Sequence, residues 1–352
     1  MTSALTGETA PLEVDVLNTL FSVPQRAWIE IEESSHIAEL VGRGLLLRAE
    51  DSELRDREER LADKWGPAAA LYHVSTRLRS VDLQLPEDAA EIAAEAGEAA
   101  ARFVERHGSP PGHFHSVDRP RRVTELPLLP KAGGLYAALA DRRTTRGFDS
   151  QQPVALEQLA ILLFEVFGCR GYATIHPNVV TLRKSSPSAG GLHPVEAYPL
   201  IRNVDGVEPG LYHYGVRDHV LALVSPLEQH AAEAAIGQVA AGQTWFGSAA
   251  AAILLTARFS RSFWKYRRSP TAYATLLMDA GHLSQTFYLV CAELGLGAFL
   301  TNVVDAEAIE ERLGLDGHAE GALAVLGCGV PSAERSPLDP EFLSYVPGKT
   351  GI

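Results

Sequence analysis

The sequence is poor in cysteine, which argues against a disulfide framework and against the commonest metal sites. Its three cysteines, Cys169, Cys291 and Cys328, are odd in number, scattered and flanked by apolar residues. None belongs to a Cys-x-x-Cys pair, the spacing typical of zinc and redox sites. We therefore expect buried thiols in a reducing compartment, and no bound metal.

Long apolar runs are also missing. No stretch reaches the roughly 18 apolar residues that a membrane-spanning helix needs, and the first eight residues lack the basic and apolar regions of a secretory signal. The formal net charge of −13 disfavours binding to nucleic acid and to anionic membranes. We expect a cytoplasmic protein that binds neither, so any anion site must be a local basic pocket.

Several familiar motifs are absent as well. No Gly-x-Gly-x-x-Gly follows a predicted strand, and the sequence contains no P-loop, no His-Glu-x-x-His and no Gly-x-Ser-x-Gly. Asp279, His282 and Ser284 lie close together in sequence, but without a nucleophile elbow they do not indicate a hydrolase. We expect no metal site from them either.

The length of 352 residues favours two domains, or one large domain with an appendage, and the 46% hydrophobic content is enough to bury a sizeable core. Residues 1–112 form the first in our interpretation. Helical patterns at 12–20 and 34–41 precede Gly42–Leu47, an order similar to the end of a winged helix-turn-helix. Its many acidic residues would repel DNA. A helical packing module and a peptide-docking module, which would bind an extended peptide by β-augmentation, both remain open.

An alanine-rich acidic helix over 86–107 and the linker 108–112 end this first part. Residues 113–352 then form the second domain. Its predicted helices begin near residues 135, 153 and 269, the last being a core or dimer-interface helix, and its predicted strands are 195–201, 211–214, 220–224, 250–257 and 322–328. Interleaved helices and grouped strands indicate an α+β sandwich.

The stretch Arg142-Arg143-Thr144-Thr145-Arg146-Gly147-Phe148 is the first chemical signal. Arginine offers a fixed fork of donors that suits phosphate, and hydroxyl groups fill the gaps between forks. A solvated charge run needs neither the threonines nor the aromatic residue. On its own the stretch leaves both interpretations open.

Two further stretches, together with the arginine stretch, occur in an order that is found in a known family. The loop Pro187-Ser188-Ala189-Gly190-Gly191-Leu192-His193-Pro194 and the pair Lys265-Tyr266, followed by Asp279–Gln285, occur in the same order as in nitroreductase-fold flavoproteins. More narrowly, the three stretches resemble the SagB-type dehydrogenases that oxidise azolines during ribosomal peptide maturation. The resemblance covers about residues 135–331. It implies a nitroreductase-like FMN-binding sandwich with an N-terminal winged-helix-like module, and a homodimer with FMN at the subunit interface.

The resemblance also implies roles for single residues. Arg142, Thr144 and Arg146 match an R-x-[ST]-x-[RK] pattern, in which the first arginine and the hydroxyl meet the FMN phosphate and the second basic residue lies near the flavin pyrimidine. A cation there would stabilise the reduced, anionic flavin. Arg143 is either a further phosphate contact or an ordinary surface arginine.

The loop and two later stretches complete the implied cofactor site. Ser186 and Ser188 would bond the ribityl chain or flavin edge from the partner subunit, and His193 takes a position held by glutamine in the family. His193 is alternatively a plain turn residue before proline. The remaining cofactor contacts by resemblance are Gln285, Thr301, Asn302 and Val303.

One position departs from the family pattern. Nitroreductases usually carry a phosphate-binding basic residue after the last strand, whereas here Gly329 is followed by Val330. Either Arg335 compensates for it, or Arg142 holds the phosphate together with another arginine.

Lys265 and Tyr266 match the pair that separates azoline oxidases from ordinary nitroreductases. Azoline oxidation needs a base that removes a ring proton, and a lysine beside a flavin can serve as that base, with the tyrosine relaying the proton or orienting it. The bland alternative is a solvated basic turn, because several basic residues gather there: Arg258, Arg261, Arg267 and Arg268. The same run could instead guide an acidic leader peptide.

Taken together, the resemblance implies an FMN-dependent dehydrogenase that acts on a precursor peptide, with a cyclodehydratase as a partner. Two alternatives stay open. The first is a reductase that uses NAD(P)H to reduce a small molecule or a dehydroamino acid. The second is a degenerate peptide-binding scaffold, which the departure at Val330 keeps under consideration.

Overall fold

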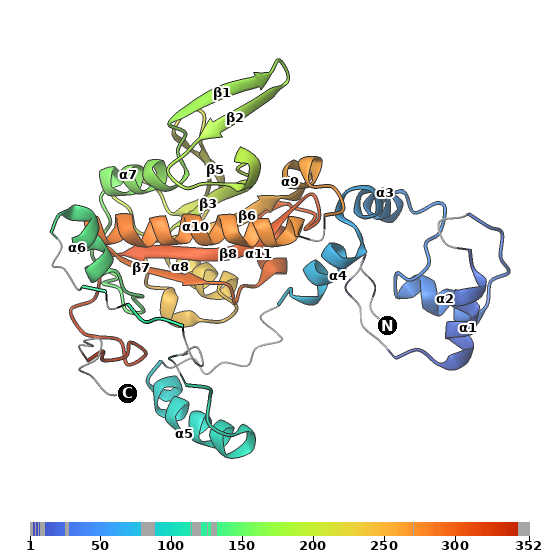
Figure 1. Ribbon diagram of the computed structural model, residues 1–352, viewed down its shortest axis with the longest axis horizontal. Coiled ribbons are helices and arrows are strands. Elements are labelled where there is room, and N and C mark those ends of the chain that lie inside the picture. The colour runs from blue at the N-terminus through green and yellow to red at the C-terminus, as the bar shows by residue number, and fades with distance from the viewer. Residues whose placement is uncertain are drawn as a thin grey trace.

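A six-stranded antiparallel sheet forms the centre of the protein (Figure 1). The computed structural model describes residues 3, 5, 7, 11–24, 28–78, 89–112, 114, 121–124, 126–127, 132–269 and 271–343. The strands lie in the order β5-β4-β3-β6-β8-β7. Their bounds are β3 Val195–Ile201, β4 Gly210–Gly215, β5 Val220–Pro226, β6 Ala251–Arg258, β7 Gly297–Thr301 and β8 Glu320–Gly329.

Helices cover both faces of this sheet. The long helix α10 (Ala272–Glu293) and helix α7 (Leu156–Phe167) pack on one face, while α8 (Gln229–Val239) and α11 (Ala306–Leu313) pack on the other. Side chains alternate along β6, so that Ile253 joins the first core and Leu254 the second. The expected α+β sandwich is confirmed, and α10 is its core helix.

The predicted elements of this part are largely confirmed. Strand β3 has the predicted bounds, and β4, β5, β6, β8 and α10 agree with their predictions to within a few residues. Helix α6 (Gly134–Asp141) lies immediately before the arginine stretch. The hairpin of β1 (Gly171–His176) and β2 (Val179–Arg183) was not predicted, and it projects from the sheet in Figure 1. Helix α9 (Phe259–Lys265) occupies the region read as a basic turn.

Within the described residues, the regular elements of the N-terminal part are helices, joined by coil and turns. Its helices are α1 Val14–Ser22, α2 Ser35–Gly42, α3 Ser52–Arg60, α4 Pro67–Ser75 and α5 Ala89–His107, with a π-helical turn over Leu61–Trp65. The first three residues of the predicted helix over 86–107 lie outside the described residues. No described helix of the protein has the length and apolar character that crossing a membrane requires.

The stretch Leu45–Leu47 forms no strand, although its order after two helices is similar to the start of a wing. The backbone N–H groups of Leu45 and Leu46 both donate to the carbonyl of Leu40. The leucines thereby close the end of α2 instead of extending into a strand, because the last carbonyls of a helix need donors. The helical alternative is the one that the described residues support.

The end of the N-terminal part packs into the main core. Trp65 is 3% exposed and stacks on Phe263 of α9 at 4.7 Å between ring centroids. Leu61, Ala69 and Ala70 join the same core. The domain boundary near residue 112 stays a prediction, and residues 61–78 contact the sheet domain closely whichever way the chain is divided.

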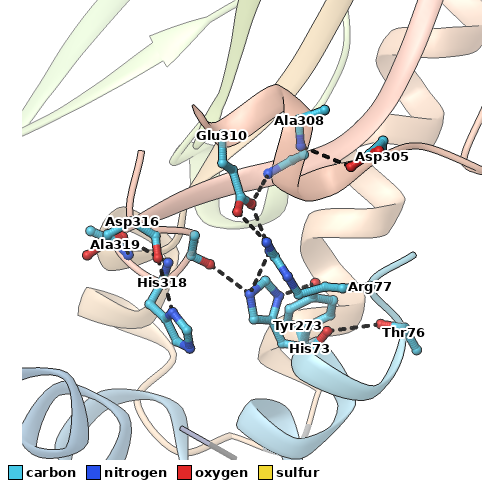
Figure 2. A network of polar contacts seen from close by, with 12 residues as sticks. His73, Thr76, Arg77, Tyr273, Asp305, Ala308, Glu310, Asp316, His318 and Ala319 are labelled. Carbon is cyan, nitrogen blue, oxygen red and sulfur yellow. Dashed lines mark hydrogen bonds and ion pairs between the residues drawn. The ribbon is translucent and has the colours of Figure 1, made fainter. Parts of the chain in front are cut away.

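A buried polar network fastens this segment (Figure 2). The Nε2 of His73 lies 2.7 Å from the carbonyl of Gly317 and must carry the proton, since a carbonyl only accepts. Its Nδ1 then accepts from the hydroxyl of Tyr273 on α10 at 2.9 Å. Arg77 forms a two-point ion pair with Glu310 of α11, one contact measuring 2.7 Å. The network joins α4 to α10 and α11.

This network predicts acid sensitivity. Burial, followed by the charge of Arg77, lowers the pKa of His73 to about 3, whereas an unfolded histidine titrates near about 6.5. The unfolded chain therefore binds the proton first, and the stability from this residue is lost as pH falls from about 6.5 toward 3. Between about pH 6.5 and 5, we expect a loss of about 2 kcal/mol in unfolding free energy.

Denaturant unfolding of the wild type and of His73→Gln at both pH values checks this expectation. The variant should lose less stability on acidification than the wild type does. His318, whose pKa burial lowers to about 4, is present in both proteins, so its contribution cancels. Equal pH slopes for the two proteins would contradict the role given to His73.

Candidate active site

The loop between β2 and β3 is anchored on helix α10. Ser188 donates its hydroxyl proton to one carboxylate oxygen of Asp279, and the backbone N–H of Ala189 donates to the other at 3.1 Å. Ser188 Oγ in turn accepts the backbone N–H of His193 at 2.9 Å. One buried carboxylate thus holds the loop at two adjacent residues.

The loop backbone adopts an unusual conformation. Gly190, Gly191 and His193 have φ angles of 62°, 66° and 46°, in the left-handed region that suits glycine. His193 lacks that freedom, and the contact of its Nε2 with the carbonyl of Leu182 at 3.1 Å holds it in place. Burial and then the charge of Lys184 lower the pKa of His193.

Lys265 and Tyr266 lie directly over this loop. A Cβ atom placed on Gly190 would come within 2.6 Å of Lys265 Nζ and 2.7 Å of the Tyr266 hydroxyl. Both polar ends therefore meet at one glycine, and no larger residue fits without displacing them. Lys265 Nζ also lies 5.6 Å from the centre of the Tyr266 ring. The structure brings together the two motifs that the sequence separates by about 70 residues.

The surrounding basic run is only partly solvated. Arg258 forms an ion pair with Glu196 at 2.6 Å, and Arg261 donates to the carbonyl of Leu192 in the same loop. Arg267 lies 3.8 Å from Asp63 and is exposed. Lys265 is also exposed in the single chain. The run is therefore a folded element that supports the loop, with Lys265 at its accessible end.

Ser186 and Gln285 differ in accessibility. Ser186 is 4% exposed, and its hydroxyl lies 2.7 Å from that of Thr286 on α10. Gln285, one residue earlier on the same helix, is exposed. Ser284 donates to the carbonyl of Ala280 at 2.6 Å, a bond within its own helix.

The arginine stretch lies at the opposite end of α10. Its backbone runs beside β7 and β8, where the N–H of Thr145 donates to the carbonyl of Ala298 at 2.7 Å and that of Asp149 to Val330 at 2.9 Å. The hydroxyl of Thr144 lies 3.1 Å from that of Tyr288, and the guanidinium of Arg142 lies 5.5 Å from the Tyr288 ring centre. Arg146 pairs with Asp339 at 3.0 Å.

A cavity of about 700 Å³ opens beside this stretch. Arg142, Arg143, Arg146 and Arg335 all line it. Within the described part of the chain, Arg142, Arg143 and Arg335 form no ion pair. Three carboxylates, Asp141, Glu334 and Asp339, line the same cavity. Guanidinium groups that form no ion pair nevertheless suit a phosphate. Arg335, in the chain that follows β8, brings a basic side chain to this wall, whereas the position after Gly329 holds Val330.

The third predicted group lies apart from both clusters. The hydroxyl of Thr301 accepts from Gln243 Nε2 at 3.0 Å and from the backbone N–H of Val303 at 3.1 Å. Thr301 is 7% exposed, so its side chain is used within the fold. Asn302 is exposed at the end of β7. Among the described residues, their hydrogen bonds reach neither the loop nor the arginines.

Sequence reasoning missed three members of this arrangement. The sequence places Asp279 in the stretch that resembles the family but assigns it no contact, and it singles out neither Thr286 nor Tyr288. All three lie on α10, whose rise of about 1.5 Å per residue separates Asp279 from Tyr288 by about 14 Å. The available signal was the set of polar side chains within the core helix, since such groups need partners when buried.

Comparisons with known proteins agree with this architecture. The model described as the nitroreductase family matches residues 139–330. MJ1384 of Methanocaldococcus jannaschii, whose name places it among the nitroreductases, is 30% identical over 182 residues, which cover 51% of this chain and 83% of that protein. The trifolitoxin-processing protein TfxB of Rhizobium leguminosarum is 28% identical over 223 residues, 61% of this chain. The match spans 58% of TfxB, which is less than two thirds of its length.

Two solved structures were also compared. A Ralstonia eutropha structure described as a candidate nitroreductase gives a TM-score of 0.45 at 23% identity, covering 62% of this chain and 89% of that one. A chain of the Escherichia coli microcin synthetase McbBCD complex, with truncated pro-MccB17 bound, gives 0.47 at 19% identity, covering 71% and 95%. The family match and the Methanocaldococcus relative carry the assignment: the chain belongs to the nitroreductase family.

Proposed function

We propose that the protein is an FMN-dependent dehydrogenase that oxidises thiazoline or oxazoline rings to azoles in a ribosomally made precursor peptide. The proposal rests on the position of Lys265 and Tyr266, whose polar ends meet at Gly190 in the loop that we expect to border the flavin. Similarity to a protein named for trifolitoxin processing supports the choice of substrate class. Family membership supports the oxidoreductase activity.

The donors in the arginine cavity fit the phosphate end of FMN. Arg142, Arg143 and Arg335 would hold the phosphate, and bound FMN would supply the hydride acceptor. Thr144 lines the same cavity. Arg146 contributes less charge than the sequence suggested, because Asp339 already pairs with it.

The reaction removes two hydrogens from adjacent ring carbons and forms a carbon–carbon double bond. One hydrogen leaves with its electron pair as hydride, and the other leaves as a proton. In this proposal Lys265 Nζ takes up that proton, and the Tyr266 hydroxyl orients the amine. Because Lys265 is accessible, a peptide-borne ring can approach it without the protein unfolding.

A second copy of the chain completes the site in this proposal. Helices α6 and α10 expose apolar side chains, with Leu135 62%, Leu139 48% and Met278 61% exposed. Exposed apolar groups on elements that flank a site are typical of an interface. A homodimer would let the arginine cavity of one chain face the serine loop of its partner. The azolines would come from a cyclodehydratase.

Incubation with an azoline-containing peptide under air tests the function. Purified holoprotein should be yellow, should release FMN on denaturation, and should lower the peptide mass by two hydrogens for each ring. Peptide that lacks azolines should be unchanged. A colourless protein that cannot be reconstituted with FMN would overturn the proposal.

A reductase of small molecules is the alternative that the Methanocaldococcus relative favours. Such an enzyme takes its electrons from NAD(P)H. Rapid bleaching of the flavin by NADPH in the absence of peptide, together with no oxidation of azolines, would establish this alternative.

A further inference from the structure

The buried carboxylate of Asp279 has no role in the chemistry described so far. Asp279 is 4% exposed and lies on α10. Burying a carboxylate is costly unless hydrogen bonds compensate it. Its two oxygens accept from Ser188 and Ala189, both in the loop. The hydrogen bonds of this buried carboxylate therefore connect helix α10 to the loop.

These bonds revise the role of Ser188. A hydroxyl has a single proton to donate, and that of Ser188 goes to Asp279. Its oxygen already accepts from the backbone of His193. Toward a flavin, Ser188 could then only accept one more hydrogen bond. Its main function in this chain lies in connecting α10 to both ends of the 188–193 loop.

The loop in turn lies against the polar ends of both Lys265 and Tyr266. Gly190 is one residue beyond Ala189 and contacts the ends of both side chains. Its φ of 62° is accessible to glycine but strained for other residues. A shift of the loop by even a fraction of an ångström would therefore move the surface on which Lys265 Nζ and the Tyr266 hydroxyl rest.

We propose that Asp279 is a positioning residue for the Lys265–Tyr266 pair, acting through Ser188 and Ala189 on the seat that Gly190 provides. The inference rests on the proposed function, in which Lys265 is the base. Asp279 itself touches neither Lys265 nor Tyr266 in any contact given by the structure.

Asp279→Asn tests this role, because it keeps the side-chain shape but replaces one accepting oxygen with a donor. We expect kcat for azoline oxidation to fall about 10- to 100-fold, as small misplacements of catalytic groups do. Flavin content and the KM for peptide should stay within about twofold, since no uniform binding contact is lost. Ser284→Ala is the matched control: Ser284 is equally buried on α10 but bonds only to its own helix.

A double-mutant cycle separates positioning from general damage. In a Lys265→Ala background, Asp279→Asn should lower the residual rate no further, because its effect passes through Lys265. An equal loss in both backgrounds would overturn the proposal, as would unchanged kcat in Asp279→Asn. Ser188→Ala replaces it if Asp279→Asn does not fold, with the same expectations.

A measurement without flavin or peptide keeps this test independent of the function. The rate at which an acylating reagent labels Lys265 in the apoprotein, followed by mass spectrometry, should change at least about threefold in Asp279→Asn and not in Ser284→Ala. If labelling changes while the wild type oxidises no azoline, the proposed function fails and the positioning stands. Unchanged labelling overturns the positioning whatever the activity.

Discussion

Lys265→Ala is expected to lower the rate of azoline oxidation by about 10²- to 10⁴-fold, the range that a positioned general base contributes. The flavin should remain bound, because the Lys265 side chain lies at the loop and away from the arginine cavity. Turnover measured by peptide mass, together with the flavin-to-protein absorbance ratio, checks both parts of this expectation.

The control for this variant comes from the same basic run. Arg267→Ala removes an exposed positive charge two residues away that does not touch Gly190. It should keep wild-type turnover. If Arg267→Ala weakens peptide binding as much as Lys265→Ala does, the basic residues over 258–268 guide an acidic peptide. Lys265 would then not be the general base.

A second lysine, Lys184, is the alternative candidate for the base. Burial lowers the pKa of Lys184, which begins the segment leading into the same loop. A lysine with a lowered pKa is the kind of group that serves as a base. Full activity in Lys265→Ala with loss of activity in Lys184→Ala would move the base assignment to Lys184.

Removing the arginines of the cavity is expected to release FMN. Arg142→Ala and Arg335→Ala each delete a guanidinium that lines the cavity without an ion-pair partner in the described residues. A hydrogen bond to a charged group is worth about 1.5–3 kcal/mol, so each change should weaken FMN binding by about 10- to 100-fold. Fluorescence titration of apoprotein with FMN measures the effect.

Riboflavin separates phosphate binding from flavin binding. It lacks the phosphate, so its affinity should be similar in the wild type and in both variants. Arg217→Ala, an exposed arginine in the turn between β4 and β5, serves as the charge control and should bind FMN normally. If Arg335→Ala binds FMN as the wild type does, Arg335 does not replace the basic residue missing at Val330.

Elements with a clear hydrophobic period could be predicted from the sequence. β3 and β6 alternate into two cores, and α10 carries apolar residues at helical spacing along its buried side. The β1–β2 hairpin could not be predicted in the same way. Its residues are mostly exposed, with Tyr172 at 76% and Ile175 at 71%, so burial imposed no period on them.

In the candidate site, too, some features could be predicted from the sequence and others could not. Residues within one stretch, such as Lys265 and Tyr266, could be identified from local pattern alone. Contacts between distant stretches could not, because they depend on how α10 crosses the sheet. The role of Asp279 could be inferred only once its carboxylate was seen to face Ser188. Arg335 could be named from the sequence as a replacement for the missing basic residue, and the structure adds that it lines one cavity with Arg142.

Anaerobic mixing of the holoprotein with an azoline peptide is the most direct test of whether the bound flavin oxidises azolines. We expect the visible absorbance of the oxidised flavin to be lost, with one azole formed per flavin reduced and no requirement for NAD(P)H. Lys265→Ala should show little bleaching with the same peptide. An unchanged flavin spectrum with azoline peptide, together with rapid bleaching by NADPH alone, would contradict the proposed azoline dehydrogenase activity.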